Sequence, residues 1–465
     1  MSDKTILTDL YQLTMLASYH DNNKGEDMST FDLFIRKLPE DWGYYIANGI
    51  EDAIDYITSL KFEESDIKYL KEQEFFKPQF IEYLKGFKFE GDVYAVKEGT
   101  PIFPNEPILR VTAKRSQAQF VETALLNMIN FQTMIATKAN RIVNAAKDAK
   151  IVDYGLRRAQ EEDAAMKGAR ATYIGGAIGT SNVKAGKEYG IKILGTQAHS
   201  FVMSFPTELE AFRAYVKTFP NKATLLIDTY DTIQGAKNAA IVAKELEKQG
   251  DRLNSVRLDS GDLCDLSKKV REILDKEGLH YVNIVASNDL NEYKIEELRK
   301  NGAKITGYGV GTEMITAKPV AAVPGVYKLV EDNDGAKIKL SHEKKTYPGK
   351  KQVYRATGED GKYSHDVLGL DFEPIEGTPL LEKVVKQGKR VTGRRSLEEI
   401  RQYTLDNVLR LPEHLKENKV KQYYEMKISD ELMKLMVYTT LKYENCKLED
   451  IPLPEGFELE QQGGW

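Results

Sequence analysis

Between residues 151 and 330 the chain alternates short apolar runs with longer amphipathic segments. The apolar runs have the length of strands, and the amphipathic segments carry apolar residues at helical spacing. We predict strands from Ile151, Ala171, Ile191, Ala223, Asn254, Tyr281, Ala303 and Val326, and helices over Pro206–Thr218, Thr232–Gln249, Leu263–Glu277 and Leu290–Asn301. Strands that alternate with helices are typical of βαβ units and a parallel sheet. About eight units in so short a stretch predict a compact, irregular (β/α) barrel, with an open doubly wound sheet as the alternative.

The regions on either side of this stretch have different patterns. Gly91–Ala113 alternates apolar and turn residues, which predicts short antiparallel strands, and Gln117–Ala146 predicts one long helix or two abutting helices. After residue 330 we predict a loop at Ser341–Gln352 and helices at Ser396–Asn407 and Ile428–Tyr443. The α/β chain is therefore predicted to have three domains: an N-terminal α/β domain (1–150), the barrel (151–330), and a Lys- and Glu-rich helical C-terminal extension (331–465) packed on the first.

Composition narrows the class of protein. The chain has 465 residues, with 66 Lys and Arg against 71 Asp and Glu, and a net charge of −5 argues against a nucleic-acid partner. No apolar run reaches the ~18–20 residues that span a bilayer, and the N-terminus lacks the apolar core of a secretion signal. We therefore expect a cytoplasmic protein with no membrane partner. The two cysteines, Cys264 and Cys446, exclude a disulfide scaffold and a four-cysteine zinc site.

Polar, charged and glycine residues follow almost every predicted strand of the barrel. In a (β/α) barrel these positions converge on one face, which carries the active site. The residues are Arg157, Arg158, Gly175, Gly176, Gly179, Thr180, Ser181, His199, Asp228, Asp231, Arg257, Asp259, Ser260, Gly261, Asp262, Ser287, Asn288, Asp289, Gly309, Gly311 and Thr312. Purely structural residues would scatter their charges over both ends of the barrel. The pattern therefore favours a ligand site at this face.

Two features of this face point to phosphate binding and to a histidine at the barrel mouth, but they do not identify the reaction. Gly307–Thr312 is glycine-rich, but its last glycine comes one residue too early for a dinucleotide loop, so its backbone N–H groups better suit a single phosphate. No GxxxxGK[ST] motif for a nucleoside triphosphate is present. His199 follows a predicted strand, and its sequence context fits a reactive histidine and a hydrogen-bonded one at the barrel mouth about equally.

Eight motifs occur in order along the chain and together closely resemble the nicotinate phosphoribosyltransferase family. They are TDLYQLTM (Thr8–Met15), DYGLRRAQ (Asp153–Gln160), GTSNVKAG (Gly179–Gly186), GTQAHS (Gly195–Ser200), LIDTYDT (Leu226–Thr232), VRLDSGDL (Val256–Leu263), SNDLNE (Ser287–Glu292) and GVGT (Gly309–Thr312). The resemblance implies a type II phosphoribosyltransferase fold and a homodimer with shared active sites. It also implies the reaction: nicotinate, phosphoribosyl pyrophosphate, ATP and water give nicotinate mononucleotide, pyrophosphate, ADP and phosphate, in NAD biosynthesis.

The same resemblance implies roles for individual residues. His199, Arg257 and Asp259 are expected to be catalytic: ATP phosphorylates His199, Arg257 meets the pyridine carboxylate or stacks on the ring, and Asp259 orients the ring nitrogen or the ribose. Mg²⁺ is expected to arrive with the diphosphate, with Asp259 and Asp262 as candidate ligands and no preformed protein metal site. Expected substrate-binding residues are Tyr11 (reaching into the partner's site), Lys138, Arg141, Arg157, Thr180, Ser181, Ser287, Asn288, Gly309, Gly311 and Thr312.

Three other functions stay open at this point. Nicotinamide phosphoribosyltransferases share the Arg-x-Asp-Ser-Gly-Asp pattern, but Ser181 stands where nicotinamide-using relatives have an acidic residue. The absence of a carboxylate there favours the anionic nicotinate. Quinolinate phosphoribosyltransferases are much shorter and lack the ATP-coupled histidine. A catalytically silent homologue that acts as a binding protein is disfavoured because Arg157, His199, Arg257 and Asp259 are all present.

Overall fold

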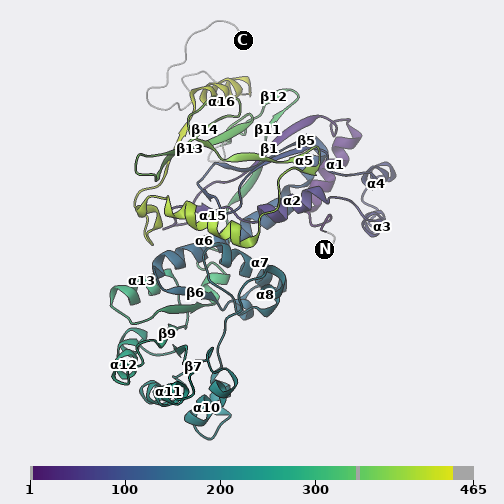
Figure 1. Cartoon of the computed structure of the whole chain (residues 1–465). Coiled ribbons are helices and arrows are strands. Elements are labelled where there is room, and N and C mark those ends of the chain that lie inside the picture. The colour runs from purple at the N-terminus through teal and green to yellow at the C-terminus, as the bar shows by residue number, and fades with distance from the viewer. Residues whose placement is uncertain (1–3, 342–345, 444–465) are drawn as a thin grey trace. The chain divides into compact units, whose positions relative to one another are not determined.

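The computed structural model describes residues 4–341 and 346–443 and divides the chain into two compact units (Figure 1). The first unit combines the chain up to Thr133 with residues 322–415 and the chain from Val420 onward. The second unit, which carries most of the predicted barrel, comprises Met134–Ala321 and Lys416–Lys419. The boundary at residue 133 falls inside helix α6 (Glu122–Ala146), which follows the short helix α5 (Arg115–Phe120). The stretch predicted as one or two helices therefore forms two.

The first unit is built on a seven-stranded sheet in the order β12-β11-β1-β5-β3-β16-β17. All the neighbouring strands in it are antiparallel. The strands are β1 (Met28–Ile35), β3 (Asp92–Val96), β5 (Pro107–Lys114), β11 (Gly325–Asp332), β12 (Gly335–Ala336), β16 (Leu381–Lys386) and β17 (Lys389–Arg390). Strands β3 and β5 confirm the antiparallel pair predicted within Gly91–Ala113.

A second sheet and the remaining helices complete this unit. The sheet has the order β15-β13-β14-β18 and comprises β13 (Lys351–Thr357), β14 (Tyr363–Leu370), β15 (Thr378–Pro379) and β18 (Glu425–Ile428). A small pair joins β2 (Tyr45–Ile46) to β4 (Pro101–Ile102). The helices are α1 (Leu10–Asp21), α2 (Ile50–Thr58), α3 (Glu64–Glu72), α4 (Pro78–Lys85), α15 (Leu397–Leu409) and α16 (Asp430–Tyr443), with the 3₁₀ turn η2 at Glu413–Lys416.

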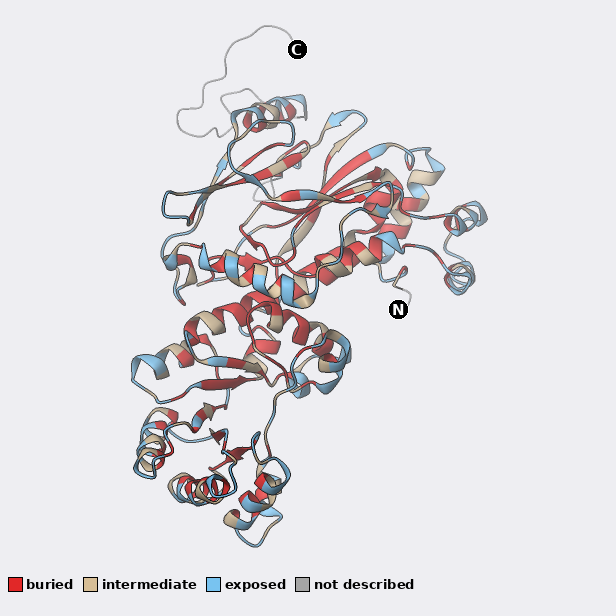
Figure 2. Cartoon of the chain, viewed as in Figure 1, coloured by how far each residue is buried: buried red, intermediate tan, exposed pale blue. Residues whose placement is uncertain are grey.

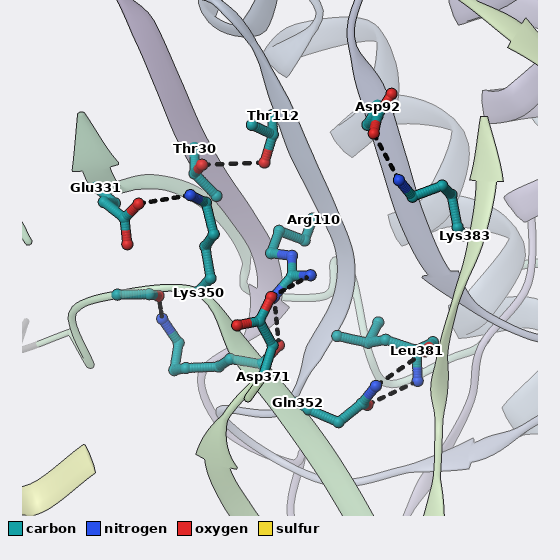
Figure 3. A network of polar contacts seen from close by, with 12 residues as sticks. Thr30, Asp92, Arg110, Thr112, Glu331, Lys350, Gln352, Asp371, Leu381 and Lys383 are labelled. Atoms are coloured by element: carbon teal, nitrogen blue, oxygen red, sulfur yellow. Dashed lines mark hydrogen bonds and ion pairs between the residues drawn. The ribbon is translucent and has the colours of Figure 1, made fainter. Parts of the chain in front are cut away.

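The C-terminal extension packs on the N-terminal strands, as the fold prediction expected. Strand β16 pairs with β3, and polar side chains add further links (Figure 3). Arg110 on β5 forms an ion pair with Asp371 at 3.0 Å, and Lys383 on β16 reaches Asp92 on β3 at 2.7 Å. Helices α15 and α16 confirm the two predicted helices, but the extension also contributes strands β12–β18, which its description as helical missed. Within the predicted loop Ser341–Gln352, residues 342–345 lie outside the described residues, and Lys351–Gln352 belong to β13.

The second unit contains a five-stranded parallel sheet in the order β6-β10-β9-β8-β7. Its strands are β6 (Lys150–Asp153), β7 (Thr224–Leu226), β8 (Ser255–Leu258), β9 (Asn283–Ala286) and β10 (Gly307–Val310). Its helices are α7 (Glu161–Ile174), α8 (Val183–Tyr189), α9 (His199–Met203), α10 (Glu208–Thr218), α11 (Thr232–Glu247), α12 (Leu263–Lys276), α13 (Glu292–Lys300) and α14 (Thr312–Ile315), with the 3₁₀ turn η1 at Leu156–Arg158. Side chains of Asp231, Asp262 and Asn291 accept backbone N–H bonds at the starts of α11, α12 and α13, which fixes where these helices begin.

The parallel sheet of the second unit is open, and no closed barrel forms among the described residues. Three of the eight segments predicted as barrel strands do not join this sheet, although the one from Val326 is a strand. The segment from Ala171 is the end of helix α7, which stops at Gly175. The segment from Ile191 makes only an isolated parallel bridge, Thr180 to Ile193, beside the bridge from Thr180 to Asp153 of β6. The segment from Val326 is β11, which lies in the antiparallel sheet of the first unit.

The strands of the second unit are short but deeply buried. Figure 2 shows its sheet and the inner faces of its helices as buried, with the outer helix faces exposed. The core includes Ile151, Leu225, Val256, Ile284 and Val310 from the five strands. A parallel sheet covered by helices is apolar on both faces, so polar residues are left to the strand ends. Among the described residues, no helix is both long enough and apolar enough to cross a membrane.

Candidate active site

The site lies where the parallel strands of the second unit end, and Arg257 on β8 is at its centre. Its Nε donates to Ser287 Oγ at 2.9 Å, and its Nη1 donates to Thr196 Oγ1 at 2.8 Å. Its Nη2 lies 3.0 Å from Asp259 Oδ1, and its guanidinium carbon lies 5.8 Å from the ring centre of Tyr154. The planar guanidinium thus contacts the segment after β8, the segment after β9 and the loop before α9, which a lysine ammonium could not do.

Asp259 connects this arginine to His199. Its Oδ1 accepts a short hydrogen bond from Ser287 Oγ, and its Oδ2 lies 3.7 Å from His199 Nε2. Burial by itself disfavours the charged carboxylate, but the Ser287 hydrogen bond and the Arg257 charge outweigh that effect and hold the pKa of Asp259 below its ordinary value. Asp259 therefore stays ionised at neutral pH and can stabilise positive charge that develops beside it.

His199 is the first residue of helix α9, and its side chain is 41 % exposed. Its Nδ1 lies 3.2 Å from Thr229 Oγ1. Its Nε2 lies on the side of the Asp259 carboxylate. The ring is thus oriented by two segments and still open to a reactant.

Asp228 supports the loop that follows β8. Its Oδ2 accepts from the Asp259 backbone N–H at 2.9 Å and from Ser260 Oγ at 2.6 Å. Its Oδ1 is buried and has no hydrogen-bond partner among the described residues. Asp262, four residues after β8, caps helix α12 by accepting from the N–H groups of Cys264 and Asp265.

Ser287, Asn288 and Asp289 form a strained turn after β9. Asn288 and Asp289 both have positive φ, at 97° and 43°, a backbone region that residues other than glycine rarely adopt. The turn holds the Ser287 hydroxyl between Arg257 and Asp259. Strain of this kind is typical of sites where a side chain must be aimed.

Gly309 on β10 leaves space for the ring of Tyr154. A Cβ atom at Gly309 would lie 2.3 Å from Tyr154 Cε2, which is far inside van der Waals contact. The Gly309→Ala variant should therefore displace the Tyr154 ring and destabilise the protein by about 1–3 kcal/mol, the usual cost of overpacking. Denaturant unfolding measures this. Gly393→Ala is the control, because a Cβ there meets nothing within 4 Å, and equal stability of the two variants would contradict the prediction.

Thr180 and Ser181 come from the loop before helix α8. Thr180 is fully buried, and its hydroxyl donates to Asp153 Oδ2 at 2.7 Å. Burial raises the pKa of Asp153. Ser181 instead lines a cavity of about 210 Å³ together with Leu156, Glu162, Met166, Asn182, Val183 and Lys184. Thr180 therefore acts on the backbone geometry of the loop, whereas Ser181 faces open space.

Comparison with known proteins shows which protein family this chain resembles. Models of the N-terminal domain, the main family region and the C-terminal domain of nicotinate phosphoribosyltransferases match residues 6–130, 149–333 and 370–436. A nicotinate phosphoribosyltransferase of Mycobacterium tuberculosis is 40% identical over 430 residues, with 92% of each chain covered. That of Bacillus subtilis is 44% identical over 378 residues, covering 79% of this chain and 76% of the relative.

The chain belongs to the nicotinate phosphoribosyltransferase family. The crystal structure of human nicotinic acid phosphoribosyltransferase is similar with a TM-score of 0.82 at 28% identity, covering 92% of this chain and 99% of that one. A nicotinate-nucleotide pyrophosphorylase from Pyrococcus furiosus gives a TM-score of 0.72 at 25% identity, covering 88% and 97%. The mixed α/β fold, with its parallel sheet and its N-terminal α/β domain, is therefore the fold of this family.

Two basic residues expected at the phosphates of the family's substrate are buried in ion pairs. Lys138 and Arg141 on α6 are 1 % and 4 % exposed, and both pair with the buried carboxylate of Glu292 at the start of α13. The distances are 2.5 Å from Lys138 Nζ and 3.2 Å from Arg141 Nε. Both charges are thus buried and already paired, and in this structure they join α6 to α13. The expected phosphate contact stays a prediction.

The Lys138→Met variant tests that structural role. It should destabilise the protein by about 3 kcal/mol, the lower end of the usual cost of breaking a buried ion pair, because Arg141 still partners Glu292. Lys269→Met is the matched control: its pair with Asp265 is exposed and should contribute less than about 1 kcal/mol. Denaturant midpoints of the two variants give the comparison. Equal midpoints would contradict the structural role.

The remaining predicted residues differ in how they are placed. Arg157 and Arg158 on η1 are exposed beside the loop after β6, as phosphate-binding residues would need to be. Gly311 and Thr312 stand at the start of α14. Tyr11, 46 % exposed on α1, belongs to the first unit. Among the described residues no group of three His, Cys, Asp or Glu is arranged to hold a metal ion.

Sequence reasoning missed three residues that contact Arg257 or border it. Thr196 and the backbone carbonyl of Gln197 accept from its Nη1, and Tyr154 lies against its guanidinium. All three stand inside motifs that had been recognised, GTQAHS and DYGLRRAQ. Attention to the neighbours of His199 and Arg157 in those motifs could have found them.

Proposed function

We propose that this protein transfers the phosphoribosyl group of phosphoribosyl pyrophosphate to nicotinate, giving nicotinate mononucleotide and pyrophosphate for NAD biosynthesis in the cytoplasm. The nicotinate ring nitrogen attacks C1 of the ribose while the bond from C1 to the pyrophosphate oxygen breaks. The observation that carries this proposal is the Arg257, Asp259 and His199 cluster in a chain of this family. It provides a fixed cation for a carboxylate, a fixed anion for the sugar and an exposed histidine.

The charges of the cluster suit this reaction. Arg257 would bind the pyridine carboxylate through the Nη1 edge that now contacts Thr196 and Gln197. The ionised Asp259 would stabilise the oxocarbenium-like sugar in the transition state. Exposed Arg157 would take the anionic leaving group, and Ser287 and Asn288 would position Asp259 and the sugar. The glycine-rich turn from Gly309 to Thr312 would hold the 5′-phosphate through backbone N–H groups.

A magnesium ion brought by the pyrophosphate fits this site. When bound, it would neutralise charge on the leaving group. The buried Oδ1 of Asp228 is a carboxylate oxygen without a hydrogen-bond partner among the described residues, so it suits a divalent cation. Asp262 suits it less well, because its Oδ1 already caps helix α12. Asp259 would contribute through the oxygen that lies towards His199.

ATP would act through His199. The imidazole of the partly exposed His199 would attack the γ-phosphorus of ATP, the bond to the ADP oxygen would break, and water would later hydrolyse the phosphohistidine to phosphate. The phosphate never enters the nucleotide product. Its added charge would order the loops around phosphoribosyl pyrophosphate, so the coupling is conformational.

A product assay tests the proposed function. Nicotinate, nicotinamide and quinolinate are each supplied with phosphoribosyl pyrophosphate, with and without ATP. We expect nicotinate to be strongly preferred, because Ser181 stands in the sequence where nicotinamide-using relatives have an acidic residue that would repel its negative charge. We also expect ATP to raise turnover. Equal or faster turnover of nicotinamide, or no nucleotide product from nicotinate, would refute the proposal.

We also propose a homodimer in which exposed Tyr11 contacts nicotinate in the partner's site. Tyr11→Ala should then weaken nicotinate binding without loss of fold. At a nicotinate concentration too low for either variant alone, mixing Tyr11→Ala subunits with Arg257→Ala subunits should restore part of the activity, because one hybrid site has both native residues. Steady-state rates before and after subunit exchange provide the measurement. No recovery after verified exchange would mean that each site is built within one chain.

A further inference from the structure

The backbone around His199 does little to fix the direction of its imidazole. Residues 194–198 belong to no helix or strand, and His199 is the first residue of α9, a helix of five residues without a side-chain N-cap. The strand expected before this segment is reduced to an isolated bridge between Thr180 and Ile193. Because the His199 side chain is 41 % exposed, its ring has room to turn. Its direction is therefore set by residues from other segments.

Two neighbouring residues after β7 hold both sides of the contact between His199 and Asp259. Thr229 Oγ1 lies 3.2 Å from His199 Nδ1, and His199 Nε2 lies 3.7 Å from Asp259 Oδ2. Asp228 accepts from the backbone N–H of Asp259 at 2.9 Å and from Ser260 Oγ at 2.6 Å. The segment after β7 thus holds the loop that carries Asp259 with one side chain and contacts the ring of His199 with the next.

The side chain of Thr229 suits this contact. A hydroxyl can both donate and accept, so it can bond Nδ1 in either tautomer of the imidazole. The branched Cβ of threonine restricts the side chain to few rotamers, which keeps the hydroxyl aimed. Valine has nearly the same shape but offers the ring no polar partner. The hydroxyl is therefore the part of Thr229 that a variant should remove.

We propose that Thr229 is a positioning residue for His199, whose hydroxyl holds the imidazole in the direction in which it is phosphorylated. This inference rests on the proposed function, in which ATP phosphorylates His199. A ring that is free to turn spends only part of its time in a reactive orientation, which lowers the rate of the step. Thr229 acts through His199 and needs no contact with the phosphoryl group.

The Thr229→Val variant removes the hydroxyl and keeps the shape of the side chain. We expect the rate at which γ-labelled ATP labels the protein to fall about threefold to tenfold, the factor that one hydrogen bond is worth, and ATP-independent transfer to fall less. Thr229→Ser restores the hydroxyl and should return labelling to near the native rate. Thr218→Val is the control, because Thr218 is exposed at the end of α10 and its hydroxyl bonds the backbone of its own helix.

Nuclear magnetic resonance of the imidazole nitrogens follows the ring without depending on turnover. The chain has six histidines, and the signals that are missing in His199→Ala identify His199. In the free protein, Thr229→Val should change the nitrogen shifts of His199, because Nδ1 loses its partner, and should leave those of the other histidines unchanged. Thr229→Ser should return them towards the native values. If the melting temperature shows that the valine variant does not fold, Thr229→Ala takes its place.

The possible results distinguish this inference from the function on which it rests. Native nitrogen shifts for His199 in Thr229→Val overturn it, because the ring then keeps its state without the hydroxyl. A native labelling rate in that variant, or no recovery in Thr229→Ser, overturns it as well. If the native protein takes up no label, the proposed role of ATP has failed, and the His199 shifts alone decide whether Thr229 holds the ring.

Discussion

The His199→Ala variant is expected to take up no phosphate label from γ-labelled ATP. In the native protein the label should be acid-labile and base-stable and should lie on the peptide that contains His199, as a phosphoramidate requires. The reason is local: His199 is the exposed imidazole at the strand ends, oriented by Thr229 and Asp259, and no cysteine nucleophile or GxxxxGK[ST] motif offers another route for ATP.

The same variant should keep part of the transfer reaction. Arg257 and Asp259 remain in place, so slow phosphoribosyl transfer without ATP should persist, while ATP hydrolysis and the gain in affinity from ATP are lost. His280→Ala is the control, because His280 is an exposed histidine that pairs with Asp275 on α12. Label that persists unchanged in His199→Ala would refute the mechanism.

Arg257→Lys should lower kcat/KM for nicotinate about a thousandfold, which corresponds to about 4 kcal/mol. Lysine keeps the positive charge but has a single ammonium. It cannot bond Ser287 and Asp259 and also offer a paired edge to a carboxylate. The loss should therefore come from geometry and not from charge.

Steady-state kinetics with nicotinate and nicotinamide measure this effect. Nicotinamide turnover should fall less, because its neutral amide makes a weaker bond to the guanidinium. Arg213→Lys is the control, since Arg213 forms an exposed ion pair with Glu245. A kcat/KM for nicotinate that stays near the native value would show that Arg257 does not bind the carboxylate.

The local sequence determined most of the parallel sheet. Five of the eight predicted strands form β6 to β10, and the predicted helices between them begin at residues such as Asp231 and Asp262, whose side chains cap them. Apolar runs bounded by capping residues specify such elements without help from distant segments. The positions at the end of β8 also pointed to Arg257 and Asp259, because residues at the ends of parallel strands meet at one edge of the sheet. His199 was found through its motif, although the strand predicted before it is only an isolated bridge.

Only the tertiary structure decided where ambiguous segments and buried charges belong. The run from Ala171 continues helix α7, and β11 joins an antiparallel sheet, because apolar character does not specify which surface will cover it. The local sequence around Lys138 does not show that its ammonium pairs with Glu292, 154 residues later in the chain. The contact of the Thr196 hydroxyl with Arg257, 61 residues later, likewise depends on segments that lie far apart in the sequence. The periodicity of apolar residues indicates local conformation. Strand pairing, ion pairing and burial are set by residues that lie far apart in the sequence and meet only when the chain folds.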